Sequence, residues 1–134
     1  MNLIILDTSV LVSDLRTGRY EQRIQSLPGS IRLSSVVLAE LWRGASTRPE
    51  REFLLRLSRN RIVLTPTKNH WLESGEILSR MRVDLGLTPG RLRDLHFDVL
   101  IALTARSHGA CLIASNRADF EAIQKYRKFD LEVW

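Results

Sequence analysis

The chain has 134 residues, of which 44% are hydrophobic, which is enough for one domain with a complete core. It carries a formal net charge of +5, and no apolar run is long enough to span a bilayer, so an integral membrane protein is not expected. The basic residues are 17 Arg and 3 Lys. Since Arg binds phosphate in bidentate geometry, this composition favours a nucleic-acid partner. A basic surface without a partner, or an interface with an acidic protein, fits the same composition.

The N-terminal residues and the single cysteine bear on the cellular compartment, and the lack of linkers bears on the number of domains. The N-terminus has neither a basic flank nor a small-residue cleavage site, so we expect no signal peptide. The only cysteine, Cys111, lies in an apolar run and is expected to be a small core residue. These features predict a protein of the reducing cytoplasm. Without an evident linker or repeat, we expect residues 1–134 to form a single domain.

The first predicted element is a strand over residues 3–6, an unbroken apolar run that ends abruptly at Asp7. A run without alternation is typical of a strand buried on both faces, at the centre of a parallel sheet. The carboxyl ends of such strands form the edge at which open α/β sheets bind their ligands. Asp7 could therefore act in a site there, or it could simply cap a helix that begins near Val10.

The middle of the chain alternates predicted helices and short strands. The predicted elements are an amphipathic helix over 16–27, a strand over 31–33, a buried helix over 36–42 after the capping pair Ser34-Ser35, an amphipathic helix over 49–59, a strand over 62–64, a helix over 68–83 capped by Thr67, and a loop over 86–90. The helix over 36–42 is apolar nearly all round, except for Glu40. A carboxylate in such surroundings is costly unless it is paired or binds a metal, although it could also reach solvent or pair with Arg43.

The last third of the chain repeats the pattern of a strand that ends in polar residues. Asp98 is predicted to open a buried helix over 99–105 that Gly109 stops, and a buried strand over 111–115 follows. Asn116 and Asp119 come just after that strand, and residues 131–134 are predicted to form an edge strand. The alternation of strands and helices predicts an α/β fold, a three-layer domain with a mainly parallel central sheet flanked by helices.

Four carboxylates are thus expected near one edge of the sheet: Asp7, Glu40, Asp98 and Asp119. Their charges would repel one another strongly without a cation. Mg²⁺ or Mn²⁺ prefers sites built of carboxylates and water, and such a site can activate a water against a phosphodiester. The pattern therefore favours a metal-dependent hydrolase of nucleic acid.

The segments ILDTSVL, SSVVLAELWRG and FDVLIALTA…GACLIASNRADF together resemble PIN domains, and more closely the VapC toxins of VapBC toxin–antitoxin pairs. The resemblance covers essentially the whole chain and matches the four acids of the family to the four named above. It implies a Mg²⁺-dependent endoribonuclease, with Mn²⁺ able to substitute, that cleaves structured RNA such as tRNA or rRNA. It also implies a homodimer and neutralisation by a VapB-type antitoxin.

Each candidate residue has an expected role. Asp7 and Asp98 are expected to bind the metal directly, and Glu40 to bind it or to orient the attacking water. Asp119 is expected to hold a metal-bound water or a second metal, so that one or two ions remain possible. Residues expected to orient carboxylates and water are Thr8, Ser9, Ser115 and Asn116. Because Ser115 stands where the family more usually has Thr, and Asn116 where some members have Asp, it stays open which of Asn116 and Asp119 lies nearer the metal.

Two nearby polar residues are expected to lie outside the site. Asp94 is interpreted as one half of a surface ion pair. His96 is two residues from Asp98, but an oxygen-preferring ion argues against a His ligand.

Other functions fit parts of the pattern. The chain could be a non-catalytic RNA- or protein-binding module with the same fold, although the complete set of acids argues against it. An aspartyl-phosphate phosphatase would need a second Asp at position 9, which is Ser, and a receiver would need a Lys late in the chain at a strand end. The substrate could also be DNA in place of RNA, since the same chemistry would cleave either.

Overall fold

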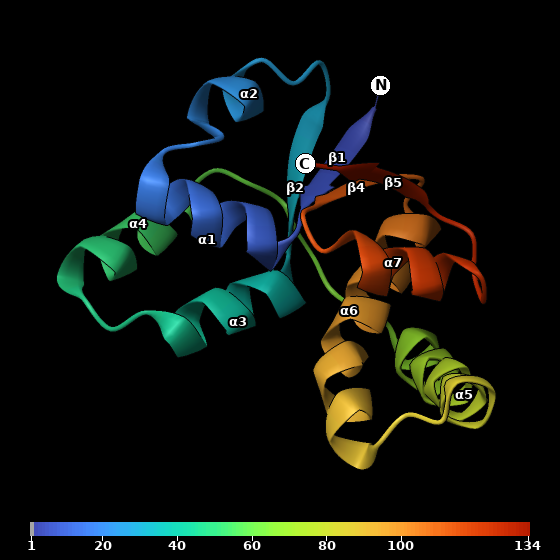
Figure 1. Ribbon diagram of the computed structural model, residues 1–134. Coiled ribbons are helices and arrows are strands. Elements are labelled where there is room, and N and C mark those ends of the chain that lie inside the picture. Colours follow the sequence, from blue (N-terminus) through green and yellow to red (C-terminus); the bar gives the residue numbers. More distant parts are fainter. Residues whose placement is uncertain (1) are drawn as a thin grey trace.

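The computed structural model describes residues 2–134 as three layers, with one parallel sheet between two groups of helices (Figure 1). The five strands are ordered β3-β2-β1-β4-β5, and every neighbouring pair is parallel. Their bounds are β1 Leu3–Leu6, β2 Ser30–Ser34, β3 Val63–Leu64, β4 Cys111–Ala114 and β5 Asp130–Val133. The predicted α/β class is therefore confirmed, with β1 at the centre and β5 at an edge as expected. No helix within the described residues is long and apolar enough to cross a bilayer.

Helices cover both faces of the sheet. In Figure 1 the first four helices lie on one side of the strands and the last three on the other. Their bounds are α1 Thr8–Thr17, α2 Glu21–Gln25, α3 Ser35–Gly44, α4 Arg48–Ser58, α5 Lys68–Leu85, α6 Pro89–Ser107 and α7 Arg117–Gln124. The apolar side chains of β1 and β4 are buried between these layers, each side chain contributing about 1.5–3 kcal/mol. The sheet core thereby holds the strand ends in place.

The predicted helix over residues 16–27 is wrong. Helix α1 continues to Thr17, and Gly18 ends it in the left-handed conformation, with φ 67° and its N–H bonded to the Asp14 carbonyl. The Asp14 side chain also accepts a hydrogen bond from the backbone N–H of Tyr20, which turns the chain into the short helix α2. The periodic apolar residues of this segment therefore straddle a turn that Gly18 makes possible.

Helix α6 corrects a second prediction, because it begins nine residues before Asp98. Thr88 caps its first turn by accepting a hydrogen bond from the N–H of Arg91, and Pro89 occupies the first helical position, where a missing N–H costs nothing. Pro89 and Gly90 therefore lie inside the helix and not in the predicted loop. Asp98 is in the middle of α6, so it is not a helix N-cap.

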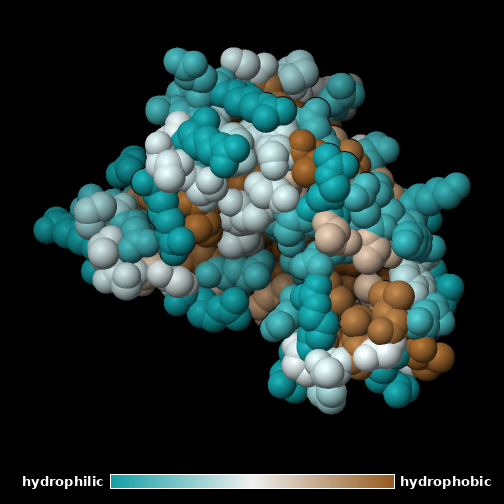
Figure 2. Space-filling view, viewed as in Figure 1, coloured by the Kyte–Doolittle hydropathy of each residue, from teal (hydrophilic) through white to brown (hydrophobic). Residues whose placement is uncertain are grey.

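Two helices bury less of their surface than their sequences predict. In α3, Trp42 is 41% exposed, so the helix is not buried all round. In α5, Trp71 and Leu72 are 48% and 61% exposed, while His70 and Ser74 face the interior. Figure 2 shows hydrophobic surface in the region occupied by α5 in the same view. These aromatic residues are available for contacts outside the domain.

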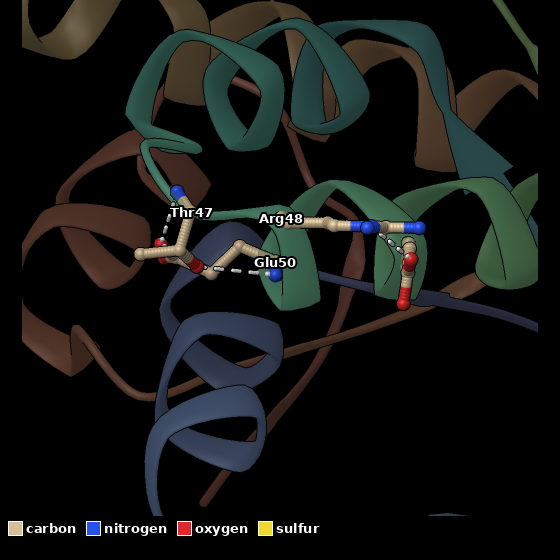
Figure 3. Close-up of polar contacts among 4 residues, drawn as sticks. Thr47, Arg48 and Glu50 are labelled. Carbon is tan, nitrogen blue, oxygen red and sulfur yellow. Dashed lines mark hydrogen bonds and ion pairs between the residues drawn. The ribbon is translucent and has the colours of Figure 1, made fainter.

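Helix α4 agrees with its predicted amphipathic pattern. Its start is a capping box, in which Thr47 accepts a hydrogen bond from the N–H of Glu50 and the Glu50 carboxylate accepts one from the N–H of Thr47 (Figure 3). Leu54 is buried, and the exposed Arg48 pairs with Glu52 at 2.9 Å. This cap fixes where α4 begins, and the helix packs against α3.

Gly29 offers a test of how closely β1 and the start of β2 approach each other. A Cβ on Gly29 would overlap the carbonyl oxygen of Asn2 and lie 2.9 Å from Cδ1 of Ile4. That carbonyl also accepts the N–H of Ser30, so it cannot move freely. We expect Gly29→Ala to lower the free energy of unfolding by about 1–3 kcal/mol, measured by urea denaturation. Gly75→Ala is the control, because its Cβ meets no atom within 4 Å and should stabilise helix α5 by up to about 1 kcal/mol.

Candidate active site

Asp7 lies at the carboxyl end of the central strand and is only 3% exposed. Its Oδ2 accepts hydrogen bonds from the backbone N–H of Ser9 at 3.1 Å and from the Ser9 hydroxyl at 2.6 Å. Ser9 Oγ in turn accepts the N–H of Ser115 at 3.0 Å, which ties the start of α1 to the end of β4. Asp7 is therefore a helix cap, as one interpretation predicted, and also a buried carboxylate at the expected edge of the sheet. Burial raises the pKa of Asp7, while the Ser9 hydrogen bonds oppose that rise.

Glu40 extends from α3 toward α1, where the Thr8 hydroxyl donates to its Oε1 at 2.8 Å. Burial raises the pKa of Glu40, the Thr8 hydrogen bond lowers it, and the nearby Asp7 raises it further. Arg43 does not form an ion pair with Glu40 among the described residues. The Cζ of Arg43 lies 6.0 Å from the centre of the Phe97 ring on α6. Glu40 thus points into the same region as Asp7 and not into open solvent.

Asp98 faces this region from the middle of α6. Burial raises the pKa of Asp98 to about 8, and repulsion from Asp7, Glu40 and Asp119 adds to this effect, while Arg91 lowers it. The four carboxylates predicted from separate segments are therefore close enough to influence one another. Their proximity arises because α3 and α6 contact each other beside the carboxyl ends of the strands (Figure 1).

Asp119 is in the first turn of α7 and forms an ion pair with Arg91 of α6. Arg91 was not singled out from the sequence, although it precedes Asp98 by seven residues, which is about two helical turns. That signal was hidden because the helix was expected to begin only at Asp98. Once Pro89 is recognised as the first residue of α6, Arg91 and Asp98 fall on one face.

The remaining predicted polar residues lie at the same edge. Thr8 and Ser9 make the hydrogen bonds to Glu40 and Asp7 described above. Ser115 Oγ and Asn116 Oδ1 are buried and have no hydrogen-bond partner, and the same is true of Asp7 Oδ1. Buried oxygens without partners are rare because losing water costs free energy. Three such oxygens beside repelling carboxylates suit a cation or its bound water.

This set of groups fits a hard divalent ion. Within residues 2–134, no three carboxylate, imidazole or thiolate groups already enclose one point as a complete metal cage. Mg²⁺ does not need such a cage, because it usually keeps several waters and binds one or two carboxylates. Asp7 and Asp98 could supply those carboxylates, with Ser115 and Asn116 placed to bind the waters.

Asp94, His96 and Cys111 lie outside the carboxylate site. Asp94 is exposed but has no ion-pair partner among the described residues, so the predicted surface ion pair is wrong. His96 is held at Nε2 by Ser74 Oγ at 3.0 Å, and the ring packs edge-on against Trp71. It is therefore part of the α5–α6 packing. Cys111 is half-buried, which is less than expected of a core residue.

The chain is similar to one protein family and to several solved structures. The sequence profile of the PIN domain family matches residues 4–126. A chain of the VapBC2 complex from Rickettsia felis, bound to a promoter DNA fragment, is 26% identical, with 98% of each chain covered and a TM-score of 0.72. The VapBC-1 structure from nontypeable Haemophilus influenzae is 24% identical over 98% of each chain, with a TM-score of 0.72. DNA-bound VapBC from Salmonella typhimurium is 23% identical over 100% of this chain and 99% of the other, with a TM-score of 0.75. A comparison with curated proteins finds no match.

The raised pKa of Asp98 generates a prediction about stability and pH. Below a pH of roughly 4, Asp98 is protonated in both the folded and the unfolded protein, so it does not lower the free energy of unfolding. Between that pH and about 8 the unfolded state ionises while the folded state keeps its proton. We therefore expect the free energy of unfolding to fall by up to about 1.4 kcal/mol per pH unit in this window when EDTA is present.

The matching variant is Asp98→Asn, which removes the charge and nearly keeps the shape. In EDTA at pH 7 it should melt at a higher temperature than wild type, and the difference should vanish near pH 4. Asp94→Asn, an exposed change on the same helix, is the control and should melt like wild type. A lower melting temperature for Asp98→Asn at pH 7 would show that Asp98 is not under repulsion in the fold.

Proposed function

The chain belongs to the PIN domain family, and on that premise we propose that it is a Mg²⁺-dependent endoribonuclease, the toxin of a type II toxin–antitoxin pair. The observation that carries the proposal is the gathering of Asp98 with Asp7, Glu40 and Asp119 at one edge of the sheet, beside buried oxygens that lack partners. Its substrate would be structured RNA such as tRNA or rRNA, whose cleavage would inhibit translation and growth. The resemblance to VapBC complexes over the whole chain supports the same conclusion.

In this proposal each acid has a role that its surroundings support. Asp7 and Asp98 would bind Mg²⁺, which when present supplies charge neutralisation and an activated water. Glu40, oriented by the Thr8 hydroxyl, would position the attacking water against the scissile phosphate. Ser9 fixes the orientation of Asp7, while Ser115 and Asn116 would orient bound water. Asp119, in the first turn of α7, is the fourth acid of the site.

The charge of the molecule supports a nucleic-acid substrate. Four acids would repel a polyanion unless cations surround them, and the chain has an excess of five positive charges. Arg91 pairs with Asp119, and the positive charge of Arg43 acts on Glu40. A non-catalytic RNA-binding module, the alternative function, would have no need to keep four carboxylates where they destabilise the fold.

The proposed partner is a VapB-type antitoxin that inserts an apolar helix next to the active site. A groove of about 480 Å³ lies between α1, α2 and α4. It is lined mainly by apolar side chains, among them Leu11, Leu15, Ile24, Phe53 and Leu57. Such a groove suits an amphipathic helix, and an Arg on the same partner could reach the carboxylates. We expect both proteins to act in the cytoplasm.

The proposal also includes a homodimer. The exposed Trp42 of α3 and Trp71 of α5 support it, because large aromatic side chains are enriched at protein interfaces.

The enzymatic proposal predicts metal-dependent RNA cleavage. Purified protein should cleave tRNA or rRNA in Mg²⁺ or Mn²⁺ and should stop in EDTA. Asp7→Asn, Glu40→Gln and Asp98→Asn should each lose most turnover, because each removes a charge that would hold the ion or the water. Asp94→Asn should keep wild-type activity. Undiminished cleavage in EDTA would refute the metal mechanism, and cleavage of DNA alone would favour the alternative substrate.

The partner proposal predicts a separable loss of antitoxin binding. Phe53→Glu places a charge in the groove and should abolish the complex with the proposed VapB-type antitoxin, measured by calorimetry, while RNA cleavage persists. Leu55→Glu is the matched control, because Leu55 is exposed on the same helix and does not line the groove. If both variants bind the antitoxin like wild type, the partner helix does not lie in this groove.

A further inference from the structure

The ion pair between Arg91 and Asp119 brings a permanent positive charge into the cluster of four site carboxylates. Of the four ion pairs among residues 2–134, it alone includes one of the four site carboxylates. The two side chains are 41% and 25% exposed, so the pair is partly shielded from water and is stronger than a fully exposed one. Arg91 also acts on Asp98, which lies two turns further along α6.

We propose that Arg91 occupies, through its ion pair with Asp119, the place that a second divalent ion would need, so that the site takes one ion and uses the guanidinium as its second cation. This inference rests on the proposed nuclease function. Arg91 would be a catalytic residue that contacts the RNA phosphate, and Asp119 a positioning residue that holds the guanidinium.

Charge disfavours a second divalent ion next to Asp119. Two-metal nuclease sites hold their ions about 3.5–4 Å apart, bridged and flanked by carboxylates that are free to bind. Here the Asp119 carboxylate is already neutralised by Arg91, and an ion placed beside it would meet the positive guanidinium. Asp7, Glu40 and Asp98 remain without a cationic ion-pair partner among the described residues, and they suffice for one ion.

The Arg91 guanidinium keeps hydrogen-bond donors that Asp119 does not use. A guanidinium carries five N–H donors, and Asp119 uses one of its terminal nitrogens, Nη2. The others can bind two phosphate oxygens at once, which a Lys could not do. The α6 backbone supports this placement, because the N–H of Arg91 is anchored by the capping Thr88 at 3.2 Å. The side chain therefore starts from a rigid helical turn.

The test counts Mn²⁺ ions by electron paramagnetic resonance of the free ion, which does not depend on activity. Wild type should bind one Mn²⁺ per chain. Arg91→Gln frees the Asp119 carboxylate and should bind a second Mn²⁺, whereas Arg91→Lys keeps the charge and should bind only one. Arg93→Gln, an exposed change two residues away, should bind one ion like wild type. Two ions in wild type, or one in Arg91→Gln, would overturn the inference.

Kinetics test the contact with phosphate. Arg91→Gln should lower kcat by about 10²-fold, as is typical when one donor to the transition state is removed, and Arg91→Lys should lose less. Asp119→Asn should lower kcat to a similar extent, and the double variant with Arg91→Gln should be no worse than either single variant, because the two residues act as a unit. Melting curves of each variant check folding, and Arg93→Gln should keep the wild-type kcat.

These outcomes distinguish a failure of the role of Arg91 from a failure of the proposed nuclease function. If wild type binds Mn²⁺ and cleaves RNA but Arg91→Gln behaves like Arg93→Gln in both assays, Arg91 has no such role and the proposed function stands. If wild type neither binds Mn²⁺ nor cleaves RNA, the proposed function and the role of Arg91 both fail.

Discussion

Repulsion among carboxylates that are held away from water is the constraint on which this structure depends. Asp7 sits at the end of a strand buried on both faces, and Asp98 sits on a helix that packs against the same sheet. Neither group can move away without disturbing the core, because interiors are close-packed. The fold therefore stores unfavourable electrostatic free energy at one edge, and the core has to supply more stability than that edge removes.

Hydrogen bonds from two hydroxyl groups partly offset this unfavourable free energy. Ser9 satisfies one oxygen of Asp7, and Thr8 satisfies one oxygen of Glu40, so two adjacent hydroxyls at the start of α1 orient two of the acids. The other oxygen of Asp7 accepts no hydrogen bond from the protein. The buried side-chain oxygens of Ser115 and Asn116 also lack a hydrogen-bond partner. A site that is satisfied on one side only is suited to accept a cation on the other. This is the physical reason for connecting the geometry to metal-dependent chemistry.

Much of the fold could be predicted from the sequence because its signals are local. The runs that form β1 and β4 are apolar without alternation, and the caps Ser34 and Thr67 precede their helices as expected. The errors occurred where a local signal was ambiguous. Gly18 splits a segment whose apolar spacing suits one helix, and Pro89 starts a helix in a segment that is also typical of a loop. In both cases a local capping signal decides the outcome: Gly18 takes the left-handed conformation that ends α1, and Thr88 caps the first turn of α6.

The sequence by itself determined which acids end or interrupt apolar segments, since a charge in such surroundings is chemically conspicuous wherever the segment lies. It also determined the parallel sheet, because buried strands separated by helices have few other arrangements. Only the tertiary structure decided which side chains contact each acid. It placed Arg91 against Asp119, left Glu40 to Thr8 instead of Arg43, and exposed Trp71, because these outcomes depend on distances between elements far apart in the chain. Periodicity and capping signals describe neighbours within a few residues, and they carry no information about such distances.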